Sequence, residues 1–209
     1  VRLYRVGDEA EFVSAVVQAV NVANAAYMRD GGLAGLSTGL DDMDRKLGGL
    51  HPSDLIILAG RPSMGKTALA TNIAFNVARR YRVGEKPDGT HGAVDGGVVG
   101  FFSLEMSSEQ LATRILSEQA QVPSERIRRG EMDEEEFRRF VAAARALEGM
   151  KLHIDDTPAL PISALAARAR QLKRKEGLDA LFVDYLQLVR PASGRSDGRV
   201  QEVSEITQG

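Results

Sequence analysis

The 209-residue chain contains no cysteine and only three histidines. Without cysteine, it can form neither a disulfide framework nor a cysteine-ligated zinc site. The histidines, at positions 51, 91 and 153, lie far apart in the sequence, so a metal site built on imidazole nitrogens is not expected. Neither sign of charge predominates: 27 Lys and Arg against 29 Asp and Glu give a net charge of −2. This balance predicts no overall electrostatic attraction to nucleic acid or to membranes.

Long apolar runs are absent as well. No stretch approaches the roughly 20 apolar residues that span a bilayer, and the start of the chain, V-R-L-Y-R-V-G-D-E-A, lacks the apolar centre of a signal peptide. We therefore expect a cytoplasmic protein that does not enter a membrane. Because the chain starts at Val1 rather than at methionine, and ends at I-T-Q-G within a predicted helix, we expect a fragment of a longer protein.

One segment carries a specific motif. Residues 60–67 have the sequence G-R-P-S-M-G-K-T, which matches the phosphate-binding pattern G-x-x-x-x-G-K-[ST]. Before it, the apolar run of residues 54–60 predicts a buried parallel strand, and after it the spacing of apolar residues 68–80 predicts a helix. Strand, glycine-rich loop and helix are the context that this motif requires. The sequence therefore predicts binding of a nucleoside triphosphate.

The chemistry of the motif follows from that context. Backbone N–H groups of the loop and of the helix N-terminus point at one spot and carry partial positive charge. Lys66 adds a full charge for the β- and γ-phosphates, and Thr67 offers a hydroxyl to Mg²⁺. ATP and Mg²⁺ are the expected ligands. The predicted nucleotide-binding residues are Gly60, Arg61, Pro62, Ser63, Met64, Gly65, Lys66, Thr67 and Ala68.

A carboxylate follows the next predicted core strand, at residues 98–102. Ligands of open α/β sheets bind at the carboxyl ends of the strands, so Glu105 is expected on the same edge as the nucleotide loop. There it can orient or deprotonate the water that attacks the γ-phosphate. The alternative is that Glu105 lies in the first turn of the following helix, which Ser107 or Ser108 would cap, and only balances the helix dipole.

A second nucleotide motif lies at residues 179–189, D-A-L-F-V-D-Y-L-Q-L-V. This is a Walker B pattern, in which a buried strand delivers one carboxylate at its end. Asp184 is expected to hold Mg²⁺ opposite Thr67. Gln187 could sense the phosphate or couple the site to the loop beyond it, or it could satisfy a buried backbone group.

Other charged groups have simpler explanations. Residues 133–136, D-E-E-E, begin a predicted helix, where they compensate its dipole rather than bind a metal. Asp155 and Asp156 end a predicted strand at residues 151–155, and we expect them to cap a turn or support the site rather than to catalyse. The cations of the predicted helix 162–176 indicate a solvated face, with nucleic-acid contact as the alternative.

Three further segments are predicted outside the sheet. Residues 9–29 have apolar side chains at steps of three and four, which predicts an amphipathic helix that packs on its own domain or on a neighbouring subunit. A short helix is expected within residues 37–51, ended by the pair at residues 48–49, G-G. Residues 83–97 are rich in Gly, Pro and Asp, which predicts an exposed hairpin or insertion.

Together, the motifs S-T-G-L-D-D-M-D-R-K-L-G-G-L, G-R-P-S-M-G-K-T, F-F-S-L-E-M-S, I-R-R-G and V-D-Y-L-Q-L resemble the DnaB-type bacterial replicative DNA helicases. The resemblance covers nearly the whole chain from residue 9 onward. It implies an α/β fold, a RecA-like P-loop ATPase core at residues 36–209 with a mostly parallel sheet flanked by helices, after a linker helix and linker at residues 1–35. It also implies that Lys66 and Thr67 bind the phosphates and Mg²⁺, that Glu105 is the catalytic glutamate and that Asp184 is the Walker B aspartate.

The resemblance implies a function and partners as well. ATP hydrolysis would drive a homo-hexameric ring along single-stranded DNA and separate the duplex, with the linker helix packed on the adjacent subunit and with primase and a helicase loader as partners. The family's N-terminal domain, glutamine phosphate sensor, arginine finger and main DNA-gripping loops are expected outside this chain. Alternatives are a RecA-like recombinase or regulatory ATPase, a small-molecule kinase with the same loop, and a fragment that binds ATP without turnover.

Overall fold

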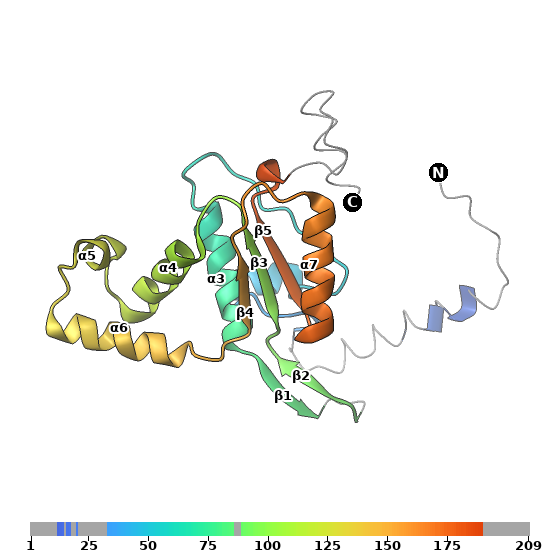
Figure 1. Ribbon diagram of the computed structural model, residues 1–209. Helices are drawn as coiled ribbons and strands as arrows, with labels where there is room; N and C mark the ends of the chain where they lie inside the picture. Colours follow the sequence, from blue (N-terminus) through green and yellow to red (C-terminus); the bar gives the residue numbers. More distant parts are fainter. Residues whose placement is uncertain (1–11, 15, 18–19, 21–32, 86–88, 190–209) are drawn as a thin grey trace, which may run out of the picture.

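The computed structural model describes residues 12–14, 16–17, 20, 33–85 and 89–189 (Figure 1). No helix among these residues has the length and apolar character needed to cross a membrane. The elements follow one another in the order α2 (Asp41–Leu47), α3 (Lys66–Arg79), β1 (Arg82–Glu85), β2 (His91–Asp95), β3 (Val99–Ser103), α4 (Ser108–Ala120), α5 (Ser124–Arg129), α6 (Glu134–Ala146), β4 (Leu152–Asp155), α7 (Ile162–Lys175), β5 (Ala180–Asp184) and the short 3₁₀-helix η1 (Leu186–Leu188).

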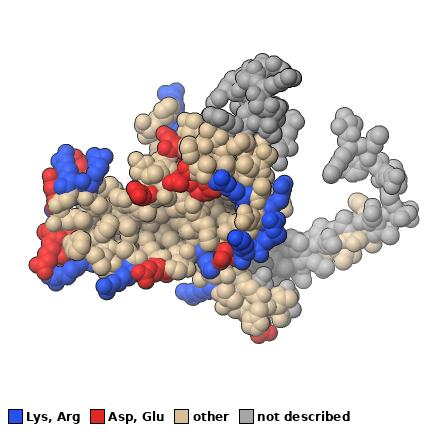
Figure 2. All heavy atoms as spheres, viewed as in Figure 1, with Lys and Arg blue, Asp and Glu red and all other residues tan. Residues whose placement is uncertain are grey.

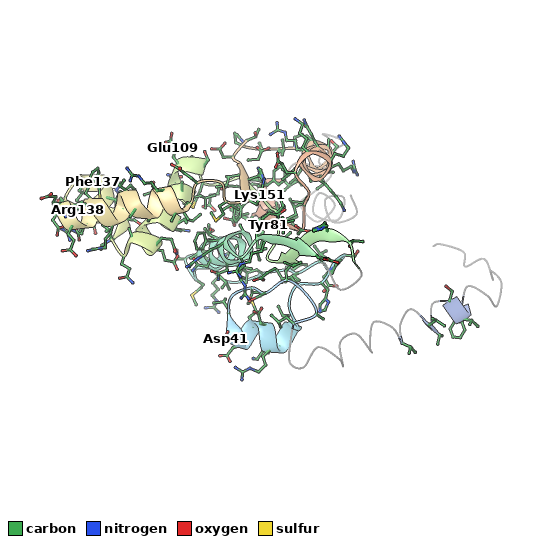
Figure 3. The ribbon with its side chains drawn as sticks, turned by 90° about the horizontal axis from the view of Figure 1, so that it is seen from below. Asp41, Tyr81, Glu109, Phe137, Arg138 and Lys151 are labelled. Atoms are coloured by element: carbon green, nitrogen blue, oxygen red, sulfur yellow. The ribbon has the colours of Figure 1, made fainter. Side chains whose placement is uncertain are left out.

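The centre of the domain is a parallel sheet with the strand order β4-β3-β5. Val99 at the start of β3 pairs with Leu152 of β4 on one side and with Ala180 of β5 on the other. Every residue of β3 is buried, because α3 covers one face of the sheet and α7 covers the other (Figure 3). A parallel strand covered on both faces has a continuous apolar sequence, as β3 does. The predicted α/β class, a parallel sheet flanked by helices, is confirmed.

Successive side chains of β3 enter two separate apolar cores. Phe101 packs with Ile73 of α3, and its ring stacks on that of Phe182 in β5 with 5.8 Å between the ring centroids. Phe102, the next residue, packs with Leu165 of α7 instead. Because side chains alternate between the two faces of a strand, this pair of phenylalanines fixes α3 and α7 on opposite sides of the sheet.

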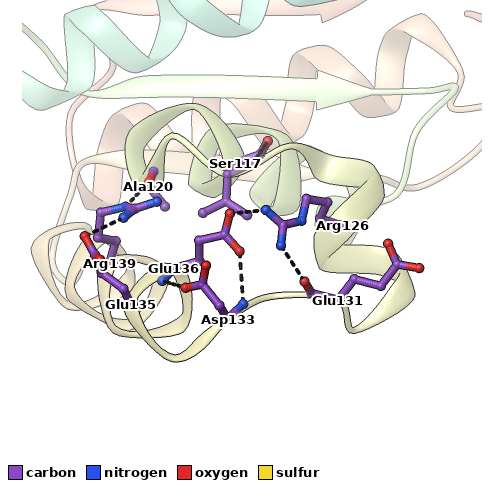
Figure 4. Close-up of polar contacts among 9 residues, drawn as sticks. Ser117, Ala120, Arg126, Glu131, Asp133, Glu135, Glu136 and Arg139 are labelled. Atoms are coloured by element: carbon purple, nitrogen blue, oxygen red, sulfur yellow. Dashed lines mark hydrogen bonds and ion pairs between the residues drawn. The ribbon is translucent and has the colours of Figure 1, made fainter.

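The helices α4, α5 and α6 form a projection beside the sheet, and a group of polar contacts holds it together (Figure 4). The Arg126 guanidinium forms an ion pair with Glu136 and donates to the Glu131 carbonyl oxygen at 2.8 Å. Glu136 also completes a capping box with Asp133, whose carboxylate accepts from the Glu136 N–H at 2.8 Å. The acidic start of α6 is therefore used for capping and ion pairing, as expected for a helix N-terminus. No sequence pattern predicted α5.

The segment before the nucleotide loop contacts α3, where the Asn76 side-chain amide donates to the Thr38 carbonyl oxygen at 3.0 Å. Leu36 and Leu50 exchange two backbone hydrogen bonds, each 2.8 Å between nitrogen and oxygen. Between them, the Asp44 carboxylate accepts from the hydroxyls of Ser37 and Thr38, both at 2.6 Å. Gly48 ends α2 in the left-handed conformation with a φ of 71°, which confirms the predicted helix end.

The prediction of a strand at residues 54–60 is wrong. This segment forms no strand and runs along the surface as a loop, with Leu55 81% exposed and Ile57 74% exposed. The physical reason is the lack of a pairing partner: among the described strands, β5 pairs only with β3, and none of them pairs with residues 54–60. An apolar run becomes a strand only where another strand accepts its backbone hydrogen bonds.

Two predictions about exposed segments have different outcomes. The hairpin expected at residues 83–97 is confirmed as the antiparallel pair β1 and β2. Of the helix expected at residues 9–29, the described residues 12–14, 16–17 and 20 are helical, and the others lie outside the described part of the chain. The helix predicted at the end of the chain also lies outside it.

Candidate nucleotide-binding site

The glycine-rich loop is a tight turn that leads directly into α3. The Met64 N–H donates to the Arg61 carbonyl oxygen at 3.3 Å, and the Leu69 N–H donates to the Gly65 carbonyl oxygen at 2.9 Å. Gly65 is the residue before the helix and has a φ of 85°. A Cβ placed there would meet nothing within 4 Å. Glycine is therefore favoured at this position by the backbone conformation and not by lack of space.

Lys66 is the first residue of α3, and its side chain turns back over the loop. Its Nζ donates to the carbonyl oxygens of Gly60, at 3.1 Å, and Arg61, at 3.2 Å. The first N–H groups of a helix take no part in its internal hydrogen bonds. An anion at this helix end would therefore meet several N–H groups and a lysine ammonium together.

Glu105 and Asp184 follow two neighbouring strands at the same edge of the sheet. Ser103 of β3 and Asp184 of β5 are partners in the strand register, and the Leu104 N–H donates to the Asp184 carbonyl oxygen at 2.8 Å. Glu105 is the next residue, and its side chain is exposed. Figure 1 shows that α3 also begins at this edge. The structure thus brings the nucleotide loop, Glu105 and Asp184 to one side of the domain.

The start of α4 bears on the alternative explanation of Glu105. Ser107 caps this helix through a capping box with Gln110, and the first helical residue is Ser108. Glu105 therefore lies before the helix and outside its first turn, where the acidic residue is Glu109. A role limited to balancing the helix dipole is better suited to Glu109 than to Glu105.

Asp184 has the chemistry of a cation ligand. It is only 7% exposed, and its Oδ2 is buried with no hydrogen-bond partner among the described residues. A carboxylate oxygen in that situation is unfavourable unless a positive group or a donor meets it. Thr67, the second residue of α3, brings a hydroxyl to the same edge. A carboxylate and a hydroxyl suit a hard cation such as Mg²⁺. In the described ranges, no three acidic or histidine side chains gather into a complete protein metal site, so bound phosphate would supply further ligands.

Gln187 lies in η1, directly after β5. Its side chain is outside the described part of the structure, so both of its predicted roles stay predictions.

Asp155 caps a turn, as expected, whereas Asp156 accepts from the N-terminus of α4. Asp155 accepts from the Thr157 N–H at 3.0 Å and from Arg168 Nη1 at 2.6 Å. Burial opposes the ionisation of Asp155, but the hydrogen bonds from Arg168 and Thr157 outweigh it and hold the pKa of its carboxyl below the ordinary value. Asp156 accepts from the Ser108 N–H at 2.7 Å, and hydrogen bonding by Ser108 lowers the pKa of that carboxyl. Nothing in the sequence pattern pointed to this pair, because its members are 48 positions apart.

Known proteins resemble this chain in sequence and in fold. A family model for the DnaB-like helicase C-terminal domain matches residues 35–209. "Replicative DNA helicase DnaB" of Rickettsia conorii is 52% identical over 186 residues, which cover 89% of this chain and 37% of that protein. The protein of the same name from Geobacillus stearothermophilus is 37% identical over 193 residues, which cover 92% of this chain and 39% of that protein.

Solved structures show the same fold. One of them, described as an ATPase domain, has a TM-score of 0.77 at 25% identity, and the match covers 98% of this chain and 66% of its own. A second is described as "The Structure Of A DnaB-Like Replicative Helicase And Its Interactions With Primase". It has a TM-score of 0.73 at 24% identity, and the match covers 98% of this chain and 44% of its own. The expected RecA-like ATPase fold is confirmed. The chain spans only 37% to 39% of the length of the two curated relatives above, and it belongs to the DnaB-like helicase C-terminal domain family.

Proposed function

We propose that this chain is the ATPase motor domain of a replicative DNA helicase, in which ATP hydrolysis drives movement along single-stranded DNA and separation of the duplex. The observation that carries the proposal is the common edge of the sheet, where a phosphate-binding loop, an exposed glutamate and a buried aspartate meet. The replicative helicases among the relatives support it. The reaction would take place in the cytoplasm.

Each residue of this edge would have a separate task. The N–H groups of residues 60–68, apart from Pro62, and the Lys66 ammonium would bind the phosphates of ATP. Thr67 and Asp184 would hold Mg²⁺, which, when bound, neutralises charge on the phosphate oxygens. Glu105 would orient the attacking water and accept its proton. Gln187, directly after the Walker B strand, would report the state of the nucleotide to the chain beyond it.

An exposed apolar helix favours assembly with further copies of the chain. Five apolar side chains of the N-terminal helix are exposed: Phe12, Val13, Val16, Val17 and Val20. A contiguous apolar surface of this kind indicates an interaction site. The proposed occupant is the adjacent subunit of a homo-hexamer, with residues 1–35 as linker and residues 36–209 as the ATPase domain. Single-stranded DNA, primase and a helicase loader are the further partners that we propose.

The test of the function is Glu105→Gln in the whole protein that the gene encodes. If Glu105 is the general base, ATP binding should be spared while hydrolysis falls by a factor on the order of 10² or more. Binding is measured by titration with a fluorescent ATP analogue and hydrolysis by release of phosphate. Lys66→Ala should lose both binding and hydrolysis.

The matched control is Glu109→Gln, which removes a carboxylate from the first turn of α4 and should leave binding and turnover close to wild type. Weaker binding of ATP with normal turnover per bound nucleotide in Glu105→Gln would assign Glu105 a structural role and contradict the proposal.

A further inference from the structure

The residues that carry Glu105 form a short loop, Ser103–Ser107, which we call the glutamate loop. Two hydrogen bonds hold this loop, one within the loop and one to β5. The Ser103 hydroxyl donates to the Met106 carbonyl oxygen at 2.6 Å, and the Leu104 N–H donates to the Asp184 carbonyl oxygen at 2.8 Å. These bonds restrain Met106 and Leu104, the residues on either side of Glu105. Each bond has its other end in a strand, at Ser103 of β3 or at Asp184 of β5.

The other end of the glutamate loop is held by a residue from a different part of the fold. Ser108 is the first residue of α4, and its N–H is one of the helix-terminal donors that have no intrahelical partner. The capping box satisfies the N–H groups of Ser107 and Gln110. The Ser108 N–H instead donates to Asp156 Oδ2 at 2.7 Å. Asp156 therefore joins the start of α4 to the end of β4.

Asp156 lies in a turn that is itself well supported. The Asp155 carboxylate accepts from the Thr157 N–H at 3.0 Å. Arg168 Nη1 donates to Asp155 Oδ2 and to the Thr157 hydroxyl, both at 2.6 Å. Arg168 comes from α7, which packs on the sheet through Leu165 and other apolar side chains. Asp156 is therefore held in place by β4, which it directly follows, and by α7, whose Arg168 binds the residues on either side of it.

We infer that Asp156 is a positioning residue that holds the glutamate loop in place for catalysis by Glu105. The inference rests on the proposed function, in which Glu105 activates water. A catalytic group must be held close to its productive geometry, and a displacement of about 1 Å can lower a rate by up to about 10². The bond from Ser108 to Asp156 restrains the loop three residues after Glu105.

A purely electrostatic role for Asp156 makes a different prediction. A negative charge near a helix N-terminus is stabilising by itself, and Asp156→Asn would then be as harmful as Asp156→Ala. If the hydrogen bond matters, the amide oxygen of Asn still accepts from the Ser108 N–H, and Asp156→Asn should keep most of the turnover.

The structure offers a second way to remove the same bond. Ser108→Pro deletes the donor, and proline is favoured at the first position of a helix. Ser107 has φ −68° and ψ 157°, which is the extended conformation that a residue before proline requires. This variant keeps the Asp156 carboxylate and the capping box, so it separates loss of the bond from loss of the charge.

The experiment measures steady-state ATP hydrolysis by the whole protein that the gene encodes. Asp156→Ala and Ser108→Pro should each lower kcat by about tenfold, the size expected for a modest loss of alignment. The KM for ATP and the affinity for the nucleotide analogue should stay within about twofold of wild type, since the nucleotide loop is untouched. Glu109→Ala, which removes a charge from the same helix end without breaking the bond, is the control and should keep a normal kcat.

A double-variant cycle separates positioning from general weakening of the fold. If Asp156 acts through Glu105, then Asp156→Ala should change the residual rate of Glu105→Gln by less than about twofold. A tenfold loss in both backgrounds would overturn the inference, as would a normal kcat in both Asp156→Ala and Ser108→Pro. A Glu105→Gln variant with normal turnover would instead contradict the proposed function itself.

Discussion

At the residue scale, the two buried aspartates of the described chain are in opposite situations. Asp44 accepts hydrogen bonds from two hydroxyls and a backbone N–H, whereas Asp184 Oδ2 is buried without any partner among the described residues. A fully bonded carboxylate stabilises the fold that surrounds it, and an unpaired one opposes folding until a ligand meets it. We therefore expect Asp44 to serve stability and Asp184 to serve binding.

The substitution Asp184→Asn tests the second expectation. It should raise the Mg²⁺ concentration for half-maximal ATPase activity by about tenfold or more, because a neutral amide is a poorer ligand for a hard cation. In the absence of Mg²⁺ and nucleotide, the variant should unfold at no lower temperature than wild type, since an unpaired buried charge has been removed. A Mg²⁺ titration that superimposes on wild type would remove Asp184 from the metal site.

The pH dependence of stability tests the role of Asp44. Burial opposes its ionisation, but hydrogen bonds from Ser37, Thr38 and Gly39 outweigh burial and hold the pKa of its carboxyl below the ordinary value. A lowered native pKa contributes stability above the unfolded pKa of about 3.9, and that contribution is lost as the pH falls through the native pKa. Asp44→Asn should therefore lower the free energy of unfolding by about 2 kcal/mol at pH 7, and the difference from wild type should shrink below about pH 4.

The measurement for Asp44 is urea unfolding at neutral and acidic pH. The control is Asp41→Asn, which alters an exposed aspartate in the first turn of the same helix (Figure 3). Its unfolding curves should stay close to wild type at both pH values. A deficit in Asp44→Asn that is equally large at both pH values would show that the carboxylate charge is not what stabilises the turn.

At the element scale, two apolar segments on either side of the nucleotide loop have different environments. Residues 55–58 are exposed, whereas α3 buries Ile73, Ala74 and Val77 against the sheet. Residues 55–58 are the more apolar of the two, L-I-I-L, whereas α3 has polar and charged residues between its apolar ones. The difference comes from what lies beside them, since α3 has the sheet as a neighbour and residues 55–58 pair with none of the described strands.

One alanine substitution in each segment tests this difference in burial between α3 and residues 55–58. Ile73 is 7% exposed, so Ile73→Ala should lower the free energy of unfolding by about 2–5 kcal/mol. Ile57→Ala removes the same atoms from an exposed segment and should change it by less than about 0.5 kcal/mol. Chemical denaturation of both variants gives the comparison. Equal losses would show that residues 54–60 are buried in solution, as their sequence alone predicts.

At the scale of the whole molecule, charges are distributed unevenly although they nearly cancel. Three arginines of α5 and α6 pair with glutamates four residues earlier on the same helix: Arg129 with Glu125, Arg138 with Glu134 and Arg139 with Glu135. Helix α7 has several cations and no acidic residue, and Figure 2 shows Lys and Arg gathered over that helix. These side chains are exposed, as both the expected solvated face and the alternative of nucleic-acid contact require.

The isolated 209-residue chain provides the test at this scale. It should bind Mg-ATP but hydrolyse it slowly and separate no duplex. Because the chain spans only 37% to 39% of the length of its two curated relatives, we expect the arginine finger and the main DNA-gripping loops in the rest of the protein. Such an arginine is worth about 10³ to 10⁵ in rate in related nucleotide hydrolases. Phosphate contacts supply most non-specific affinity for DNA. A fork-unwinding assay that shows robust ATP-dependent strand separation by this chain would contradict the prediction.

The sequence by itself determined the features that depend on neighbouring residues. The nucleotide loop and α3 follow from the glycines and Lys66, and the end of α2 follows from Gly48. The core strands β3 and β5 follow from continuous apolar runs that each end near a carboxylate. Backbone conformation, helix capping and side-chain periodicity act over a few residues, so a linear pattern contains the information they need.

Only the tertiary structure decided which distant residues meet. Residues 54–60 have the apolar sequence of a strand, yet they lie on the surface and pair with none of the described strands. Asp156 and Ser108 are 48 positions apart and meet because β4 lies parallel to β3, which brings the end of one strand to the helix that follows the other. Strand pairing and contacts between elements depend on the packing of the whole chain, and a local sequence pattern does not record them.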